Sequence, residues 1–99
     1  SFAESCTGGM LSELLTDVPG ISKVFLGSVV AYSNDIKQSV LKVSGNTLNK
    51  YGAVSEQTAK EMAQGVRLLY NTEVGISITG IAGPSGAVAD NPVAVYISG

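Results

Sequence analysis

The chain has no histidine among its 99 residues and only one cysteine, Cys6. Without histidine it cannot form a Ser-His-Asp triad, a Cys-His pair or an ordinary histidine-containing zinc site. A single cysteine also excludes an internal disulfide, which is compatible with a reducing, cytoplasmic compartment. The acidic residues are too scattered along the sequence to indicate a divalent-cation site, so we expect neither a metal nor a cofactor.

Charged residues and long hydrophobic runs are scarce as well. Charged residues make up 14% of the chain and balance to a net charge of −2, so the chain lacks the basic surplus of nucleic-acid binders. The longest apolar stretch, Val24 to Tyr32, is far shorter than the roughly 20 residues that cross a bilayer. We therefore expect no nucleic-acid partner and no membrane association. Apolar residues reach 44%, enough for residues 1–99 to fold as one small domain.

The first half of the chain predicts a helix, a strand and a second helix. Apolar spacing after Thr7 is typical of an amphipathic helix that Thr7 caps and that ends before Pro19. The nearly continuous apolar run from Val24 to Tyr32 predicts a central strand that is covered on both faces. The sequence Ser33-Asn34-Asp35 then offers three helix caps, and helical spacing continues to Val43.

The second half contains the most regular helix and two further strands. A short helix or turn is expected from Thr47 to Tyr51. Ser55-Glu56 opens a helix with one apolar stripe. The stripe consists of Ala59, Met62, Ala63, Val66, Leu69 and Tyr70. Val74 to Thr79 and Val93 to Ile97 have strand composition. Helices that alternate with strands in this way predict an α/β fold with a mostly parallel sheet.

Two glycine-rich turns, Ser5 to Gly9 and Thr79 to Gly86, are candidates for ligand binding. Ligands of open parallel sheets sit beyond the carboxyl ends of the strands, where helix N-termini present N–H groups to anions. The two turns, with the hydroxyls of Ser5, Thr7 and Thr79, predict a cradle for a phosphorylated ligand. The alternative is that the glycines only permit tight turns. Neither turn contains Gly-Lys-Ser/Thr, which excludes a P-loop kinase or GTPase.

Lys37 is the candidate base in a chain without histidine. Near the start of its predicted helix, the helix dipole opposes an ammonium and lowers the lysine pKa. Such a lysine activates a serine hydroxyl, and Tyr32 is placed to hold or relay the proton. The alternative is a solvated lysine that pairs with Asp35 or Glu4. On the residues alone, Cys6 is a small buried filler.

Five blocks of sequence resemble a known family in order and spacing. They are Ala3-Glu4-Ser5-Cys6-Thr7-Gly8-Gly9, Leu15-Thr16-Asp17-Val18-Pro19-Gly20-Ile21-Ser22, Val29-Val30-Ala31-Tyr32-Ser33-Asn34, Gly52-Ala53-Val54-Ser55 and Thr79-Gly80-Ile81-Ala82-Gly83-Pro84. Together they resemble the C-terminal domain of the competence/damage-inducible protein CinA. The resemblance implies a three-layer α/β/α fold and a nicotinamide-nucleotide amidase. Such an enzyme hydrolyses the carboxamide of nicotinamide mononucleotide to nicotinic acid mononucleotide and ammonia.

The resemblance also implies a metal-independent site built on a serine and a lysine, with a tyrosine nearby. Carried onto this chain, the lysine is Lys37 and the tyrosine is Tyr32. Ser22 is the preferred nucleophile, and Ser5 is the competitor or a substrate-binding partner. The substrate would be bound by residues of the two glycine-rich turns. These are Cys6, Thr7, Gly8, Gly9, Thr79, Gly80 and Gly83.

The family domain is longer than this chain, so we expect a domain that is incomplete at both ends. An incomplete apolar surface favours a homo-oligomer, with a dimer as the simplest form. The alternative function is a non-catalytic nucleotide-binding or regulatory module derived from the same family.

Overall fold

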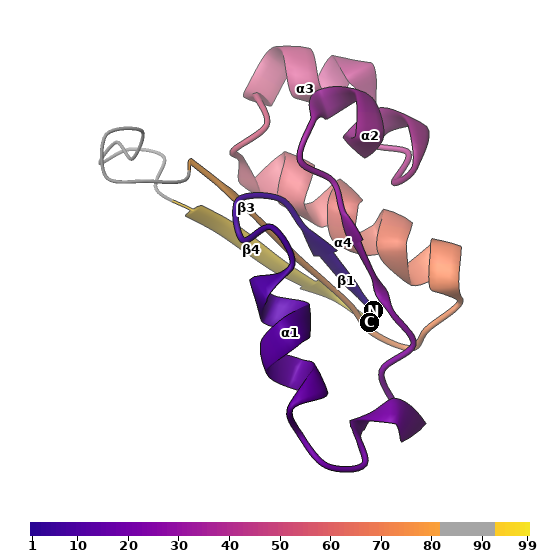
Figure 1. Ribbon diagram of the computed structural model, residues 1–99. Coiled ribbons are helices and arrows are strands. Elements are labelled where there is room, and N and C mark those ends of the chain that lie inside the picture. The colour runs from indigo at the N-terminus through magenta and orange to yellow at the C-terminus, as the bar shows by residue number, and fades with distance from the viewer. Residues whose placement is uncertain (82–92) are drawn as a thin grey trace.

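The computed structural model describes residues 1–81 and 93–99 (Figure 1). It contains nine elements in the described residues. They are β1 (Phe2–Glu4), α1 (Met10–Thr16), a 3-10 turn η1 (Ile21–Lys23), β2 (Ser28–Val30), α2 (Asn34–Ser39), α3 (Gly45–Tyr51), α4 (Glu56–Tyr70), β3 (Gly75–Gly80) and β4 (Val93–Ser98). None of the helices in these ranges is both long and apolar enough to reach across a membrane.

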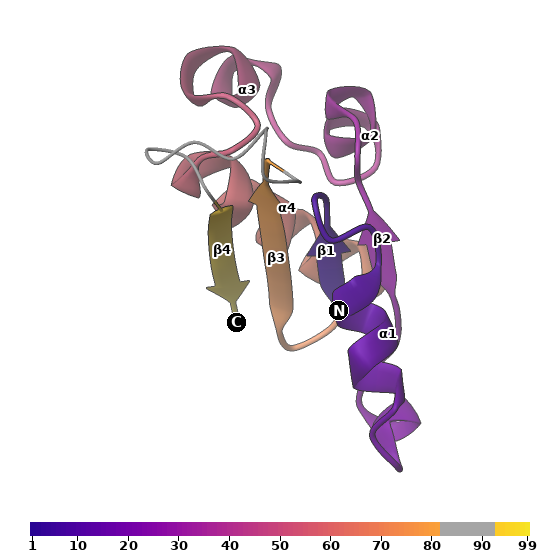
Figure 2. The same cartoon turned by 60° about the vertical axis from the view of Figure 1, so that its left-hand side comes forward.

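The strands form one mixed sheet in the order β2-β1-β3-β4. β1 is parallel to both β2 and β3, whereas β4 is antiparallel to β3. α4 packs on one face of this sheet and α1 lies on the other (Figures 1 and 2). Side chains of successive strand residues point to opposite faces, and β1 follows this rule. Ala3 joins the core beneath α4, whereas Glu4 contacts α1. The predicted three-layer α/β fold is confirmed.

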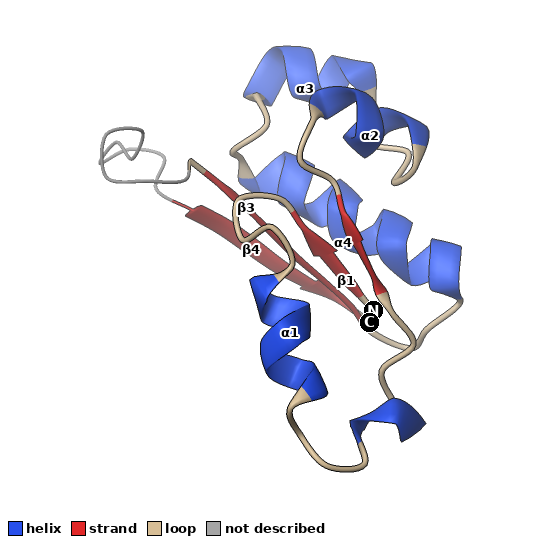
Figure 3. Ribbon diagram, in the orientation of Figure 1, coloured by secondary structure: helices blue, strands red, loops and turns tan. Residues whose placement is uncertain are grey.

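The prediction of a central strand from Val24 to Tyr32 is wrong. Only residues 28–30 form a strand, and β2 lies at the edge of the described sheet (Figure 3). Before it, Val24 and Leu26 are 74% and 61% exposed. Gly27 adopts a φ of 155°, and a Cβ there would lie 3.0 Å from the ring of Tyr70. The apolar composition of the segment led to the prediction of a strand, but composition alone does not distinguish a strand from a loop that crosses the edge of a sheet.

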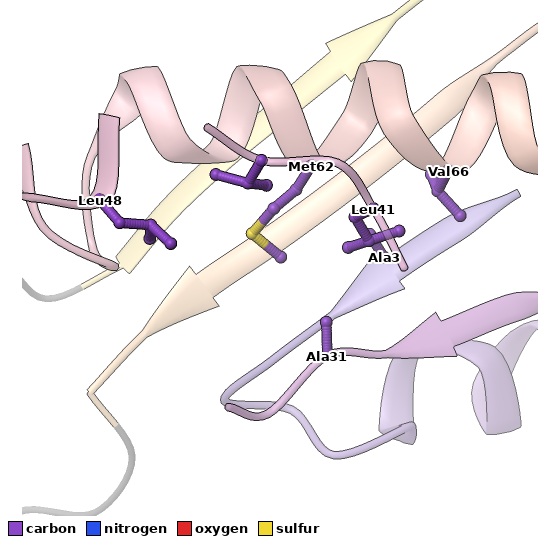
Figure 4. Packing of buried hydrophobic residues seen from close by; sticks show 7 residues of the cluster. Ala3, Ala31, Leu41, Leu48, Met62 and Val66 are labelled. Atoms are coloured by element: carbon purple, nitrogen blue, oxygen red, sulfur yellow. The ribbon is translucent and has the colours of Figure 1, made fainter. Parts of the chain in front are cut away.

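The core lies between the sheet and α4 (Figure 4). The cluster consists of Ala3, Ala31, Leu41, Val43, Leu48, Met62 and Val66. Ser55 caps α4 as predicted, because its hydroxyl accepts a hydrogen bond from the backbone N–H of Thr58 at 3.1 Å. The predicted apolar stripe is buried from Ala59 to Val66, but Leu69 is 52% exposed and only the neighbouring Tyr70 packs against the core. Of the predicted stripe, only Leu69 therefore departs from the buried face.

Candidate active site

A cavity of about 330 Å³ lies beside the carboxyl ends of β1 and β3. Figure 2 shows the arrowheads of both strands directed toward the end of the sheet where α2 and α3 lie. The cavity is lined by Ser5, Cys6, Tyr32, Asn34, Lys37, Ala53, Thr79, Gly80 and Ile81. Its size is in the usual range for small-molecule sites, and its place is the one expected for a ligand of an open α/β sheet.

Ser5 and Lys37 meet in this cavity. Ser5 directly follows β1 and Lys37 lies in α2, and the Lys37 Nζ is 3.2 Å from the Ser5 Oγ. Both side chains are buried, with 5% of Ser5 and 2% of Lys37 exposed. A hydroxyl within hydrogen-bond reach of an amine is the geometry of a nucleophile beside its base.

The surroundings of the Lys37 amine suit its neutral form. The Nζ donates to the carbonyl of Ala31 at 3.0 Å and contacts that of Tyr32 at 3.5 Å. In the structure the Nζ also donates to the Ser5 Oγ. Once deprotonated, the amine has two N–H groups for the carbonyls and one lone pair that can accept the Ser5 hydroxyl proton. Burial lowers the pKa of Lys37 below 10.5, and the nearby Cys6 thiol opposes this shift. The predicted direction of the pKa shift is correct, and its largest cause is burial.

The alternative interpretation of Lys37 as a solvated residue paired with a carboxylate is wrong. Asp35 is exposed, and the Glu4 carboxylate is bound to the start of α1. Lys37 is buried because the chain folds back on itself after α2. The helix ends at Ser39 rather than Val43, and the N–H of Val43 bonds to the carbonyl of Lys37 at 2.9 Å.

The start of α2 matches one of the three predicted caps. The Ser33 hydroxyl accepts a hydrogen bond from the N–H of Ile36 at 3.2 Å. Tyr32, just before this cap, lines the cavity, but its side chain is 71% exposed. Its contact with Lys37 is made by the backbone carbonyl. The proton-relay role of the Tyr32 hydroxyl therefore stays a prediction.

Some of the predicted substrate-binding residues lie at the cavity and others do not. Cys6, Thr79 and Gly80 line it, and the Thr79 hydroxyl donates to the carbonyl of Ala53 at 2.9 Å. Thr7, Gly8 and Gly9 are not among its lining residues. Gly83 lies outside the described residues.

The predicted cap of the first helix is wrong, and its N-terminus is already occupied. Gly9, not Thr7, is the N-cap of α1 and provides no side-chain hydrogen bond. The Glu4 carboxylate instead accepts the N–H groups of Leu11 at 2.8 Å and Ser12 at 2.9 Å. These two donors are therefore not available to a substrate phosphate.

Ser22, the preferred nucleophile, lies far from Lys37. It belongs to η1, the short turn after α1 at the bottom of Figures 1 and 2, whereas α2 lies at the top. Its side chain is exposed and does not line the cavity. Of the two candidate serines, the structure brings only Ser5 to the lysine.

Sequence reasoning missed two residues of the cavity wall, Asn34 and Ala53, and included a third, Ile81, only as a member of the predicted Thr79 to Gly86 turn. Asn34 could have been found, since it lies two residues after Tyr32. Ala53 is held at the site because its carbonyl accepts a hydrogen bond from the Thr79 hydroxyl. This contact joins segments that are distant in the sequence, so no local pattern predicts it. In residues 1–81 and 93–99, no three His, Cys, Asp or Glu side chains gather as a metal site would require.

A second, larger cavity of about 490 Å³ lies at the opposite end of β1. Its wall includes Ser1, Phe2, Phe25 and Val74, and its charged members are Lys23 and Glu73. No hydroxyl there contacts an amine side chain among the described residues, so volume alone does not make it the better candidate for catalysis.

Residues 1–98 match the family of the CinA C-terminal domain. A CinA-like protein of Thermotoga neapolitana is 57% identical over 91 residues, which are 92% of this chain and 22% of that protein. A CinA-like protein of Fervidobacterium nodosum is 54% identical over 93 residues, which are 94% of this chain and 23% of that protein. The chain thus spans less than a quarter of the length of these curated relatives.

Solved structures agree with this match. The competence/damage inducible protein CihA from Agrobacterium tumefaciens superposes with a TM-score of 0.91 at 41% identity, covering 98% of this chain and 61% of that one. A CinA superfamily protein from Escherichia coli gives a TM-score of 0.85 at 33% identity, covering 98% and 63%. On sequence and structure alike, the chain belongs to the CinA family and corresponds to its C-terminal domain.

Proposed function

We propose that this domain hydrolyses the carboxamide of nicotinamide mononucleotide, releasing nicotinic acid mononucleotide and ammonia. In this proposal Ser5 is the nucleophile and Lys37 is its base. The observation that carries it is the 3.2 Å separation of the Ser5 Oγ and the Lys37 Nζ in a buried, solvent-poor environment. The resemblance to the CinA family supplies the substrate, and the geometry supports the class of reaction.

The first half of the reaction forms an acyl-enzyme. The neutral Lys37 amine takes the Ser5 proton as the Oγ attacks the carboxamide carbon, so the amine becomes an ammonium and the carbonyl oxygen an oxyanion. As the tetrahedral intermediate collapses, Lys37 returns that proton to the leaving nitrogen. The C–N bond breaks, ammonia departs and an ester to Ser5 remains.

The second half regenerates the serine. Lys37, neutral again, takes a proton from water as its oxygen attacks the ester carbon. The C–O bond to Ser5 then breaks, and Lys37 gives its proton to the departing Oγ. The carboxylic acid product loses its own proton to solvent. No oxidant, reductant or metal is needed for the atoms and charges to balance.

The cavity wall offers a donor for the oxyanion. The backbone N–H of Cys6, next to the nucleophile, has no hydrogen-bond partner among the described residues. A preorganised donor of this kind contributes about 10²–10³ to the rate. Thr79 and Gly80, at the end of the neighbouring strand β3, also line the cavity, which supports a role in substrate binding.

The test measures ammonia release from nicotinamide mononucleotide by the protein and by two serine variants. Ser5→Ala is expected to abolish release because the nucleophile is gone. Ser22→Ala is the matched control and should keep the wild-type rate, since its exposed hydroxyl lies away from the cavity.

Ligand-induced thermal shift, recorded alongside, separates catalysis from binding. A thermal shift without ammonia release from the wild-type protein would favour the non-catalytic binding module instead. Loss of activity in Ser22→Ala with activity retained in Ser5→Ala would overturn the assignment of the nucleophile.

A further inference from the structure

Glu4 lies directly before the proposed nucleophile but on the other side of the strand. Its side chain is fully buried and faces α1, whereas the adjacent Ser5 faces Lys37. Among the described residues no cation contacts its carboxylate. A buried carboxylate destabilises the fold unless it is well hydrogen-bonded. The donors that bind the Glu4 carboxylate therefore indicate its structural role.

All four hydrogen bonds to the Glu4 carboxylate come from one short segment. Thr7 donates its hydroxyl at 2.7 Å, Leu11 its N–H at 2.8 Å, and Ser12 both its N–H at 2.9 Å and its hydroxyl. Thr7 precedes the Gly8-Gly9 pair and the other two residues follow it. One carboxylate therefore ties together the two ends of the turn that leaves Ser5.

That turn has little stiffness of its own. Gly8 and Gly9 have φ values of 61° and 108°, which glycine adopts easily but which also leave the backbone many other conformations. The N-cap residue Gly9 has no side chain to anchor the helix. The carboxylate of Glu4 supplies the missing anchor, and its charge suits the positive end of the helix dipole.

We propose that Glu4 is a positioning residue that holds the turn from Ser5 to Gly9 in place and thereby keeps the Ser5 Oγ against the Lys37 Nζ. It touches neither the amine nor the cavity, so it acts through the backbone of the turn. The inference rests on the proposed function, because the reaction provides its main readout.

The test compares Glu4→Gln with Glu61→Gln as a matched control. The Glu61 carboxylate also binds the start of a helix, accepting the N–H of Ser44 at 2.8 Å and the hydroxyl of Thr47, but it does not line the cavity. In Glu4→Gln, an NH₂ group replaces one acceptor oxygen, so donors of the turn lose their partners. A displacement of about 1 Å at a reacting group costs up to about 100-fold in rate.

We expect Glu4→Gln to lower kcat by about 10- to 100-fold with KM nearly unchanged. The midpoint of the pH–rate profile should not move, because the titrating amine is untouched. Glu61→Gln should keep the wild-type kcat. A wild-type kcat in Glu4→Gln would overturn the proposal, as would a shifted midpoint with an unchanged plateau, which would indicate a charge effect instead of positioning.

Labelling of Ser5 by a fluorophosphonate, followed by mass spectrometry, needs no substrate and keeps this test independent of the proposed function. The labelling rate should fall in Glu4→Gln by a factor similar to kcat. If the wild-type protein is labelled but releases no ammonia, the proposed function fails while the positioning role is still decided by the labelling rates. If Glu4→Gln does not fold, Ser12→Ala removes a single donor, and an unchanged labelling rate there would overturn the proposal.

Discussion

Replacing Lys37 by methionine tests the base while keeping an unbranched chain of similar length in the same buried space. The amine beside Ser5 disappears, and the serine hydroxyl loses the acceptor for its proton. General bases contribute about 10²–10⁴ to a rate, and a nucleophile and its base act as one unit. We therefore expect kcat for ammonia release to fall at least about 10³-fold, equivalent to about 4 kcal/mol in the activation barrier.

The effect of Lys37→Met on stability should be much smaller than its effect on rate. The substitution removes a buried amine whose charged form is unfavourable, which stabilises the fold. It also leaves the carbonyls of Ala31 and Tyr32 without their donor, at about 1–3 kcal/mol for a fully buried group. The two effects oppose each other, so the variant should fold.

Stability measured against pH gives a second, independent readout. Burial lowers the pKa of Lys37 in the folded protein below its ordinary 10.5. At a pH between the folded-state pKa and the unfolded-state pKa of Lys37, the unfolded chain holds a proton that the folded protein does not. The stability of the wild-type protein therefore rises with pH in this range. Below the folded pKa, the penalty for a buried charge is fully present. Lys37→Met should lack this rise.

The assay combines ammonia release with thermal unfolding from neutral pH to about pH 10, which approaches the ordinary lysine pKa. Lys60→Met serves as the control, because Lys60 is exposed on α4, and it should keep the wild-type kcat. The reasoning is refuted if Lys37→Met retains activity within about tenfold of wild type, less than a general base contributes. It is refuted equally if the wild-type protein and Lys37→Met show the same dependence of stability on pH.

Three further predictions concern stability. Gly65→Ala should destabilise the fold by about 1–3 kcal/mol in urea denaturation, because the new Cβ would lie 1.9 Å from the Leu41 carbonyl oxygen. This clash outweighs the gain of up to about 1 kcal/mol in helix propensity, so a stabilised variant would contradict the prediction. Ser55→Ala should cost about 1 kcal/mol through loss of the cap on the Thr58 N–H, and an unchanged midpoint would speak against this cap. Burial raises the pKa of Glu4, but the hydrogen bonds to its carboxylate bring this pKa below 4.5 overall. The contribution of ionised Glu4 to folding stability is therefore present above pH 4.5 and is lost as the pH falls through the folded-state pKa. The stability advantage of wild type over Glu4→Gln in thermal unfolding should shrink in acid, and a constant advantage would contradict this prediction.

Patterns within one segment predicted much of the fold. The cap and buried stripe of α4 follow from a serine and from apolar residues three and four apart, which are local features. The prediction from the apolar run Val24 to Tyr32 was wrong because its composition fits either a central strand or a loop that crosses the edge of a sheet. Which of these forms depends on β1 pairing between β2 and β3, a contact between distant segments.

For the candidate site, the sequence together with the family resemblance indicated the lysine but did not single out the serine that lies beside it. Lys37 stood out because it follows an apolar segment and a run of caps in a chain without histidine. Choosing between Ser5 and Ser22 required knowing that the end of β1 lies beside α2, which depends on the order of strands. Sequence spacing also could not reveal that Glu4 occupies the N-terminus of α1, since that contact is made across the Gly8-Gly9 turn.

The alternation of side chains along β1 explains how an acid and a base of opposite charge lie near one serine without neutralising each other. Were Glu4 on the same face as Ser5, it would pair with Lys37 and hold the amine in its charged form, which cannot accept a proton. Strand geometry turns Glu4 toward α1, where four donors bind its charge. Among the described residues, the hydrogen-bond partners of the Lys37 Nζ are then two carbonyls and the Ser5 hydroxyl, and no carboxylate. Burial lowers the pKa of the Lys37 amine, and no carboxylate beside it opposes this shift, because the neighbouring Glu4 along the strand is bound to the start of α1.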